Sequence, residues 1–113
     1  MSLADQYRIF YSCESSGDHV PNDKPVSYPL DTIIDMAMQL LQDDGDFLGI
    51  LNDADVCVQF MALGGGMIEI DIPDPPRRGS HSKSIRENEL EAQVKNVASL
   101  FSPQRIGFKF SAW

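Results

Sequence analysis

The chain has 113 residues, of which 42% are hydrophobic and 23% charged, a balance typical of one globular domain spanning residues 1–113. Its 17 acidic and 9 basic residues leave a net charge of −8, which disfavours binding to a phosphate backbone and predicts no nucleic-acid partner. No apolar run reaches the roughly 18 residues of a membrane span. Because the first residues also lack the pattern of a secretory signal, we expect a cytoplasmic protein with no membrane partner.

The first part of the chain predicts a strand, a long loop and a helix. Residues 7–13 are rich in aromatic and β-branched side chains, which is typical of a strand. Residues 14–28 combine proline, glycine, asparagine and aspartate with few apolar side chains and predict a loop. Apolar residues recur at helical spacing over residues 30–41. Pro29 suits the first turn of this helix, and Gly45 is a candidate for its C-cap.

Three short strands joined by tight turns are expected next. Residues 47–51 form an apolar run, and residues 56–63 are apolar on both faces, which is typical of a central strand. The glycines at 64–66 can adopt the positive φ angles of a tight hairpin. Residues 67–72 alternate strictly, so that three isoleucines face the core and two acidic side chains face outward.

The last part predicts a loop, a second helix and a final strand. Residues 73–84 are rich in proline, glycine, serine and basic side chains and indicate a loop in which the basic groups form local salt bridges. Ser84 and Glu87 have the spacing of a capping box, which starts a helix that continues to residue 101. Residues 106–113 alternate as a strand does.

The order of these elements is β-α-β-β-β-α-β, which predicts an α+β domain. Because the middle strands are linked by short turns, the sheet of about five strands is mostly antiparallel, and both helices cover one of its faces. The other face is then free of helices. We expect it to expose Glu69 and Asp71, with Met61, Met67 or Phe60 among them, next to turns that carry further acidic residues.

Metal and cofactor sites are not indicated by the motifs. The aspartate-rich turns fail the calcium-loop pattern, because a loop counted from Asp43 has Leu48 at its sixth and Ala54 at its twelfth position. Two cysteines and two histidines lie too far apart in the chain for a zinc site. Cys13 and Cys57 lie in apolar runs and are expected to be buried, reduced thiols. We expect no cofactor and no metal.

Enzymatic motifs are weak. His19 and His81 fall in predicted loops, where solvated side chains are expected, and the hairpin glycines lack the Lys-Ser/Thr of a phosphate-binding loop. Glu69 and Asp71 are separated by about 6.5–7 Å along one strand. Two carboxylates at that distance can serve glycoside hydrolysis, but such a site needs a cleft that raises one pKa.

A resemblance is carried by the acidic β-α-β-β-β-α-β pattern together with three segments. These are residues 67–73 (MIEIDIP), residues 78–80 (RGS) and residues 108–113 (FKFSAW). Over residues 45–113 the chain resembles small bacterial immunity proteins of toxin–immunity systems. The resemblance implies a cytoplasmic inhibitor, without catalytic residues, that binds one cognate toxin and blocks its active site.

The sequence therefore predicts a non-enzymatic inhibitor whose acidic side chains pair with basic groups around the active site of a toxin. The candidate partner-binding residues are Asp43, Asp44, Asp46, Asp53, Asp55, Glu69 and Asp71. The chain is expected to be a monomer or a homodimer. Two alternatives remain open: an inhibitor of a nucleic-acid enzyme whose acids imitate phosphates, and a small hydrolase that uses Glu69 or a loop histidine.

Overall fold

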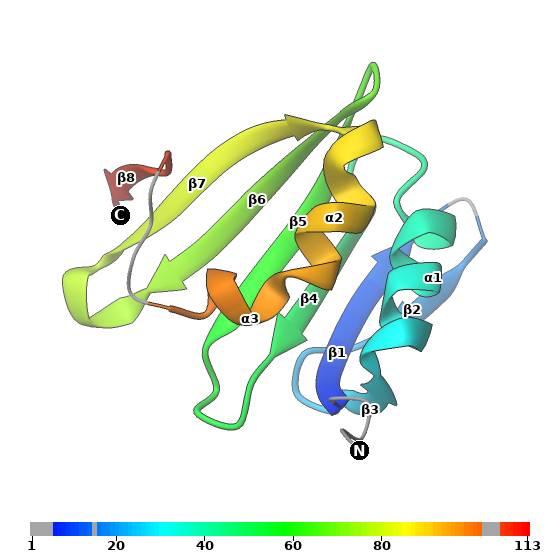
Figure 1. Ribbon diagram of the computed structural model, residues 1–113, viewed down its shortest axis with the longest axis horizontal. Helices are drawn as coiled ribbons and strands as arrows, with labels where there is room; N and C mark the ends of the chain where they lie inside the picture. Colours follow the sequence, from blue (N-terminus) through cyan, green and yellow to red (C-terminus); the bar gives the residue numbers. More distant parts are fainter. Residues whose placement is uncertain (1–5, 15, 103–106) are drawn as a thin grey trace.

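The computed structural model describes residues 6–14, 16–102 and 107–113, which form one antiparallel sheet with helices on one side (Figure 1). The strands are β1 (Gln6–Cys13), β2 (Asp18–Val20), β3 (Val26–Pro29), β4 (Phe47–Leu51), β5 (Cys57–Gly64), β6 (Met67–Asp74), β7 (Gly79–Arg86) and β8 (Lys109–Ala112). The helices are α1 (Leu30–Leu40), α2 (Leu90–Lys95) and α3 (Val97–Leu100), with short 3-10 helices at η1 (Pro75–Arg77) and η2 (Glu87–Glu89).

The strands lie in the order β2-β1-β4-β5-β6-β7-β8, and each neighbouring pair is antiparallel. β3 also pairs with β1, so that β2 and β3 share one edge of the sheet. The α+β prediction is confirmed. The sheet has eight strands rather than about five, because β2, β3 and β7 lie largely in segments whose composition predicts loops.

The core lies between the sheet and the helices. α1, α2 and α3 all lie over the same face of the sheet, as predicted (Figure 1). From α1, Ile33 and Ala37 are fully buried, and from the sheet, Ile50, Phe60 and Ile70 are fully buried against them. Complete burial of one such large apolar side chain contributes about 1.5–3 kcal/mol, which fixes this face of each strand toward the helices. None of the helices in the described ranges is long and apolar enough to span a membrane.

β7 runs through the segment that was predicted as a loop. It pairs with β6 over its whole length, from Gly79 opposite Asp74 to Arg86 opposite Met67. The alternation in this strand places serines on one face and His81, Lys83 and Ile85 on the other, so it lacks the apolar period by which strands are recognised. Arg77 does form a local salt bridge, to Asp74, as expected of this basic segment.

The second helix begins later than predicted and is broken. Ser84 lies inside β7, and the backbone N–H of Arg86 donates instead to the Glu89 carboxylate at 2.8 Å. The helix is interrupted at Asn96, whose side-chain amide donates to the Ala92 carbonyl at 2.9 Å. The buried positions Leu90, Val94 and Val97 are those expected from the helical spacing.

The remaining connections partly match the predictions. The three glycines at 64–66 have φ angles of 79°, 63° and 79°, which confirms the hairpin. Gly45 has a φ of 97° but lies beyond the end of α1, whose C-cap is Leu41. The predicted 14–28 loop contains β2 and β3, which are too short and polar to be read from sequence. The final strand is present as β8, while Ile106 lies outside the described residues.

Candidate binding face of the sheet

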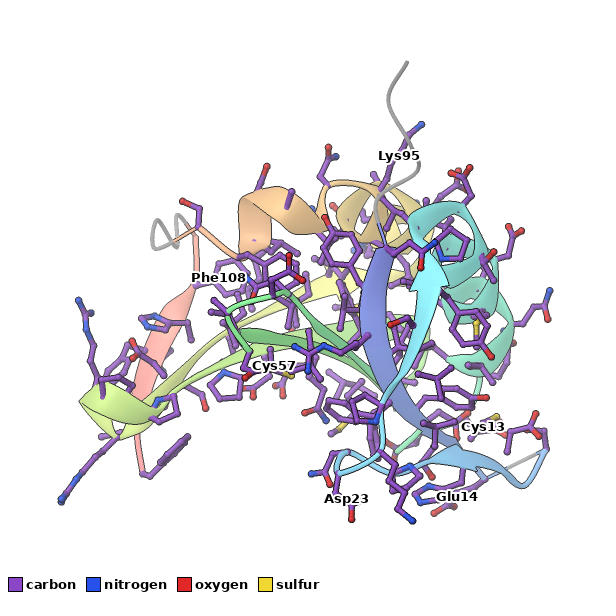
Figure 2. All side chains as sticks on the ribbon, turned by 90° about the horizontal axis from the view of Figure 1, so that it is seen from below. Cys13, Glu14, Asp23, Cys57, Lys95 and Phe108 are labelled. Carbon is purple, nitrogen blue, oxygen red and sulfur yellow. The ribbon has the colours of Figure 1, made fainter. Side chains whose placement is uncertain are left out.

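Cross-strand pairing determines which side chains share the face that carries no helix. Pairs directly opposite each other in a sheet point to the same side. One row across this side contains Phe47, Met61, Glu69 and Ser84, and the next contains Phe10, Gly49, Gln59, Asp71 and Ser82. We call these two rows, with Leu51, Cys57, Pro73 and Ser80 of the adjoining row, the open face. Figure 2 shows the helices above the sheet and Cys57 on the side away from them.

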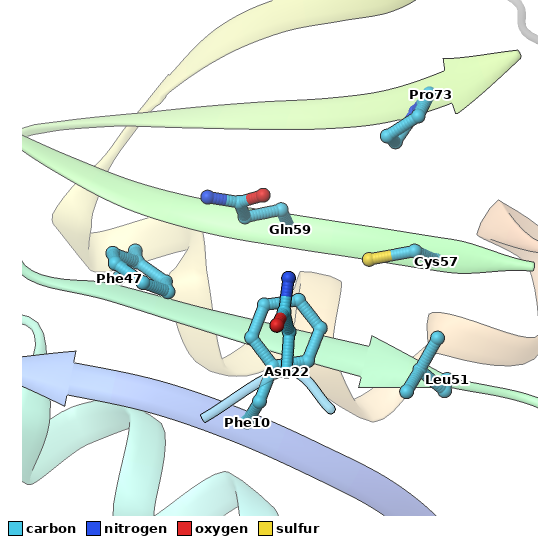
Figure 3. Close-up of a pocket in the computed structure, with 7 residues that line it drawn as sticks. All are labelled: Phe10, Asn22, Phe47, Leu51, Cys57, Gln59 and Pro73. Carbon is cyan, nitrogen blue, oxygen red and sulfur yellow. The ribbon is translucent and has the colours of Figure 1, made fainter. Parts of the chain in front are cut away.

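A hollow of about 500 Å³ lies on the part of the open face where most side chains are apolar. It is lined by residues of β1, β4, β5 and β6 and of the β2–β3 connection: Phe10, Asn22, Phe47, Leu51, Cys57, Gln59 and Pro73 (Figure 3). The Phe10 ring occupies the space above Gly49, where an added Cβ would overlap the ring carbon Cζ. Glycine is therefore required at position 49, because only a residue without a Cβ leaves room for the Phe10 ring over β4. The sequence patterns did not reveal the contact, because it depends on the register of β1 against β4.

Two carboxylates lie on the same face of β6, outside the residues that line the hollow. Asp71 is paired across the strands with Gln59, and Glu69 with Met61. Both side chains are half-buried, and across the described part of the chain neither forms an ion pair or a hydrogen bond. Burial, followed by the nearby negative charge of Glu69, raises the pKa of Asp71. The prediction that both acids face away from the core agrees with the pairing.

The indole of Trp113 extends the open face at its far edge. Its Nε1–H donates to the Ser80 hydroxyl at 3.1 Å, and 71% of the residue is exposed. Large exposed aromatic side chains are enriched at protein interfaces. Of the apolar candidates named from the sequence, Met61 and Met67 lie on this side, but Phe60 is fully buried in the core on the other side.

Asp46 is not at the surface, contrary to its sequence interpretation. It is fully buried, and its carboxylate accepts backbone N–H groups of Asp43 at 2.8 Å, Glu14 at 3.0 Å and Gln42 at 3.3 Å. The Cys13 thiol also donates to it, at 3.7 Å. Burial by itself raises the pKa of Asp46, but these hydrogen bonds outweigh that effect and lower it. Asp46 therefore joins β1 to the α1–β4 connection and has no exposed atom for a partner.

The acidic turns lie at opposite ends of β4, not along one edge. Asp43 and Asp44 are exposed before β4, and Asp53 and Asp55 are exposed after it, about 17 Å away at the usual rise of a strand. Asp55 is also neutralised within the chain, because its carboxylate accepts from the Arg8 guanidinium at 2.6 Å. The structure thus brings together Glu69 and Asp71 but separates the two turns.

A histidine–aspartate pair closes the β6–β7 turn. His81 is 8% exposed rather than solvated as predicted, its Nε2 lies 2.9 Å from an Asp74 carboxylate oxygen, and its ring packs on Phe110. The His81 hydrogen bond is the largest influence on the pKa of Asp74, which it lowers. A second hollow, of about 640 Å³, is lined by Cys57 and both members of the pair.

This second hollow does not activate a nucleophile. Burial, and then the negative charge of Asp71, raises the pKa of the Cys57 thiol to about 11, so the thiol is protonated at neutral pH. A catalytic cysteine needs the opposite shift, from a base or a positive group beside it. His81 instead points to the helix side of the sheet, since it pairs with the buried Ile72.

Within the ranges that the structure describes, no three histidine, cysteine, aspartate or glutamate side chains are grouped so that they could hold a metal ion. Comparison of the chain with protein-family models, with curated proteins and with solved structures gave no match. The candidate site consists of an apolar hollow, two carboxylates that form no ion pair within residues 6–14, 16–102 and 107–113, and an exposed indole, all on one side of the sheet.

Proposed function

We propose that the protein is an inhibitor that binds another protein through the open face, and that it acts as an immunity protein in the cytoplasm. In this role it neutralises a cognate antibacterial toxin by covering the active site of that toxin. The observation that supports the proposal is the composition of the open face. An apolar hollow lies beside two carboxylates that form no ion pair within the described residues, and the cation in the row of Asp71, Lys109, lies two strands away beyond Ser82.

A protein partner suits the extent and shape of this surface. A stable protein interface covers about 800 Å² on each partner, with aromatic anchors at its centre and polar groups around them. Phe47 and Trp113 provide aromatic surface, the largely buried Phe10 lies beside Phe47, and the serines of β7 provide a polar border. A small metabolite would contact only one part of such a face.

A basic partner suits its charge. The chain carries −8 overall, and residues 1–75 hold 14 acidic against 2 basic side chains. A negative field of this kind speeds the encounter with a positively charged surface and disfavours acidic partners. Toxins that act on nucleic acids need such a positive surface at their active sites, because they bind phosphates.

The two alternatives have less support. A phosphate mimic needs a continuous acidic strip, whereas Asp43 and Asp44 are separated from Asp53 by the length of β4, and Asp55 is paired with Arg8. A hydrolase based on Glu69 needs that carboxylate enclosed in a pocket, and Glu69 does not line either hollow described above. Of the two candidate histidines, His19 is exposed on β2, and His81 is hydrogen-bonded to Asp74 on the helix side of the sheet.

The test compares capture and growth rescue for two variants with matched charge changes. Glu69→Lys/Asp71→Lys reverses two charges on the open face. Asp35→Lys/Glu91→Lys makes the same change on exposed positions of α1 and α2. Each tagged protein is incubated with lysate of the source cells, the retained partner is identified, and it is then produced in a bacterial host with and without each variant.

We expect one partner to be retained by wild type and by the helix variant but not by the open-face variant. That partner should arrest growth when produced alone, and only the two binding-competent proteins should restore growth. A partner retained equally by all three proteins would contradict the assignment of the open face. A partner that binds through this face but does not impair growth would contradict the immunity role.

A further inference from the structure

The hollow of the open face combines features that suit one kind of side chain. The Phe10 ring lies over Gly49, and the Phe47 ring follows with its centroid 6.1 Å away at an angle of 64°. Leu51, Cys57 and Pro73 line its other part (Figure 3). The hollow therefore has aromatic surface on one side and aliphatic surface on the other, and it opens to solvent.

The polar groups around the hollow include carboxylate and amide oxygens that accept no side-chain hydrogen bond within the described residues, and the two amides also carry N–H donors. The side chains of Gln59 and Asn22 line it, and in the described ranges neither amide takes part in a side-chain hydrogen bond. Asp71 is opposite Gln59 across the strands and close enough to Cys57 for its charge to raise the pKa of that thiol. Glu69 adds a second negative charge next to Asp71, and no cation of the described chain pairs with either acid.

The apolar lining of the hollow and the acidic groups beside it together determine which kind of partner side chain can bind there. A neutral apolar side chain would fill the hollow but remove water from Asp71 without replacing its hydrogen bonds, which is costly. An anionic group would be repelled by Asp71 and Glu69. A cation on an aliphatic chain satisfies both parts, because the chain contacts Leu51 and Pro73 while its charged end reaches the carboxylate.

Among such cations the geometry favours a guanidinium over an ammonium. A guanidinium is planar, stacks on aromatic rings and donates through several N–H groups at once to a carboxylate and to amide oxygens. We propose that the hollow formed by Phe10, Phe47, Leu51, Cys57 and Pro73 receives an arginine side chain of the protein partner, whose guanidinium binds Asp71 and Gln59. The identity of the donor as a protein partner rests on the proposed function, whereas the preference for a guanidinium is a property of this chain alone.

Defined small probes test that preference without the partner. The isotope-labelled protein is titrated with N-butylguanidinium and, separately, with N-butylurea, which has a similar shape but no charge, while amide signals are followed by NMR. We expect saturable shifts at Cys57, Gln59 and Asp71, with N-butylguanidinium binding at least about fivefold more tightly than N-butylurea. N-butylammonium should fall between the two.

Two variants and one control complete the experiment. Asp71→Asn keeps the size of the side chain and should reduce the advantage of N-butylguanidinium over N-butylurea to less than about twofold. Gln59→Lys places a cation of the chain itself beside Asp71 and should abolish the shifts. Asp53→Asn removes one negative charge from an exposed turn outside the hollow and should leave the titration unchanged.

The outcomes separate this proposal from the proposed function. Equal binding of the charged and neutral probes, tighter binding of N-butylammonium, or shifts confined to the acidic turns would each overturn the arginine assignment. An unsuccessful titration together with loss of growth rescue in the open-face variant would leave the immunity role standing. A successful titration with a partner that does not impair growth would overturn the immunity role alone.

Discussion

Two regions of the molecule hold a carboxylate partly or fully out of water, and their surroundings differ. At the corner between β1 and the α1–β4 connection, Asp46 is completely buried and accepts three backbone N–H groups. On the open face, Asp71 is half-buried beside Glu69 with no partner in the described chain. The first arrangement stabilises the fold. The second costs stability, and such costs are typical of surfaces selected for binding.

The largest expected effect comes from removing the acceptor at the buried corner. Asp46→Ala leaves three backbone N–H groups without their acceptor at a partly buried corner, and each unsatisfied buried donor costs about 1–3 kcal/mol. We expect a loss of about 3–5 kcal/mol in the free energy of unfolding, measured by urea denaturation. A loss below about 1 kcal/mol would show that the corner relaxes or admits water. It would contradict the conclusion that Asp46, unlike Asp71, stabilises the fold.

The next effect tests whether the hollow has a defined shape. A methyl group at position 49 would overlap the Phe10 ring, so Gly49→Ala must displace that ring. We expect a destabilisation of about 1–3 kcal/mol by thermal and urea denaturation. The cost should shrink in a Phe10→Leu background, where no ring lies above the strand. An equal cost in both backgrounds would mean that the strain arises elsewhere in β4.

The pH dependence of two variants should have opposite signs. The raised pKa of Asp71 means that its ionised form destabilises the folded state, so Asp71→Asn should be slightly more stable than wild type at neutral pH. The lowered pKa of Asp46 means that its ionised form stabilises the folded state, so Asp46→Asn should be less stable. Both differences should shrink as the pH falls and the wild-type carboxyls become protonated. Urea denaturation between neutral and acidic pH measures them, and differences of the same sign would contradict the comparison.

The smallest effect is expected at the exposed turn after β4. The side chains of Asp55 and Arg8 are 76% and 37% exposed, and an ion pair in such a position contributes about 0.2–1 kcal/mol. Asp55→Asn should therefore change the free energy of unfolding by no more than about 1 kcal/mol, and less at high salt. A larger or salt-independent loss would indicate that the turn has a structural role like that of Asp46.

The sequence was most informative where one face of a strand is purely apolar. Ile68, Ile70 and Ile72 alternate with acids, so the direction of Glu69 and Asp71 could be predicted and agrees with the pairing. The glycines of the β5–β6 hairpin were equally clear, because they need positive φ angles. Local patterns of this kind do not depend on distant parts of the chain.

Features that depend on distant segments were missed. Asp46 follows two aspartates and a glycine and has the sequence of a solvated turn, but one of its donors is the backbone N–H of Glu14, which only the fold brings next to it. The hollow depends on the register that places Phe10 over Gly49. β7 was missed because its serines face the open side, where no apolar residue is needed.

The most direct test of the binding face uses the two cysteines. Cys57 lines the hollow and is half-buried, whereas Cys13 is buried within the fold and 3% exposed. Alkylation of both thiols is followed by mass spectrometry, with and without the captured partner, and Cys13 serves as the internal reference for unfolding. We expect the partner to slow the labelling of Cys57 at least about tenfold while that of Cys13 remains slow, because a bound side chain covers the hollow. Unchanged labelling of Cys57 in a saturated complex would place the partner elsewhere and contradict the account.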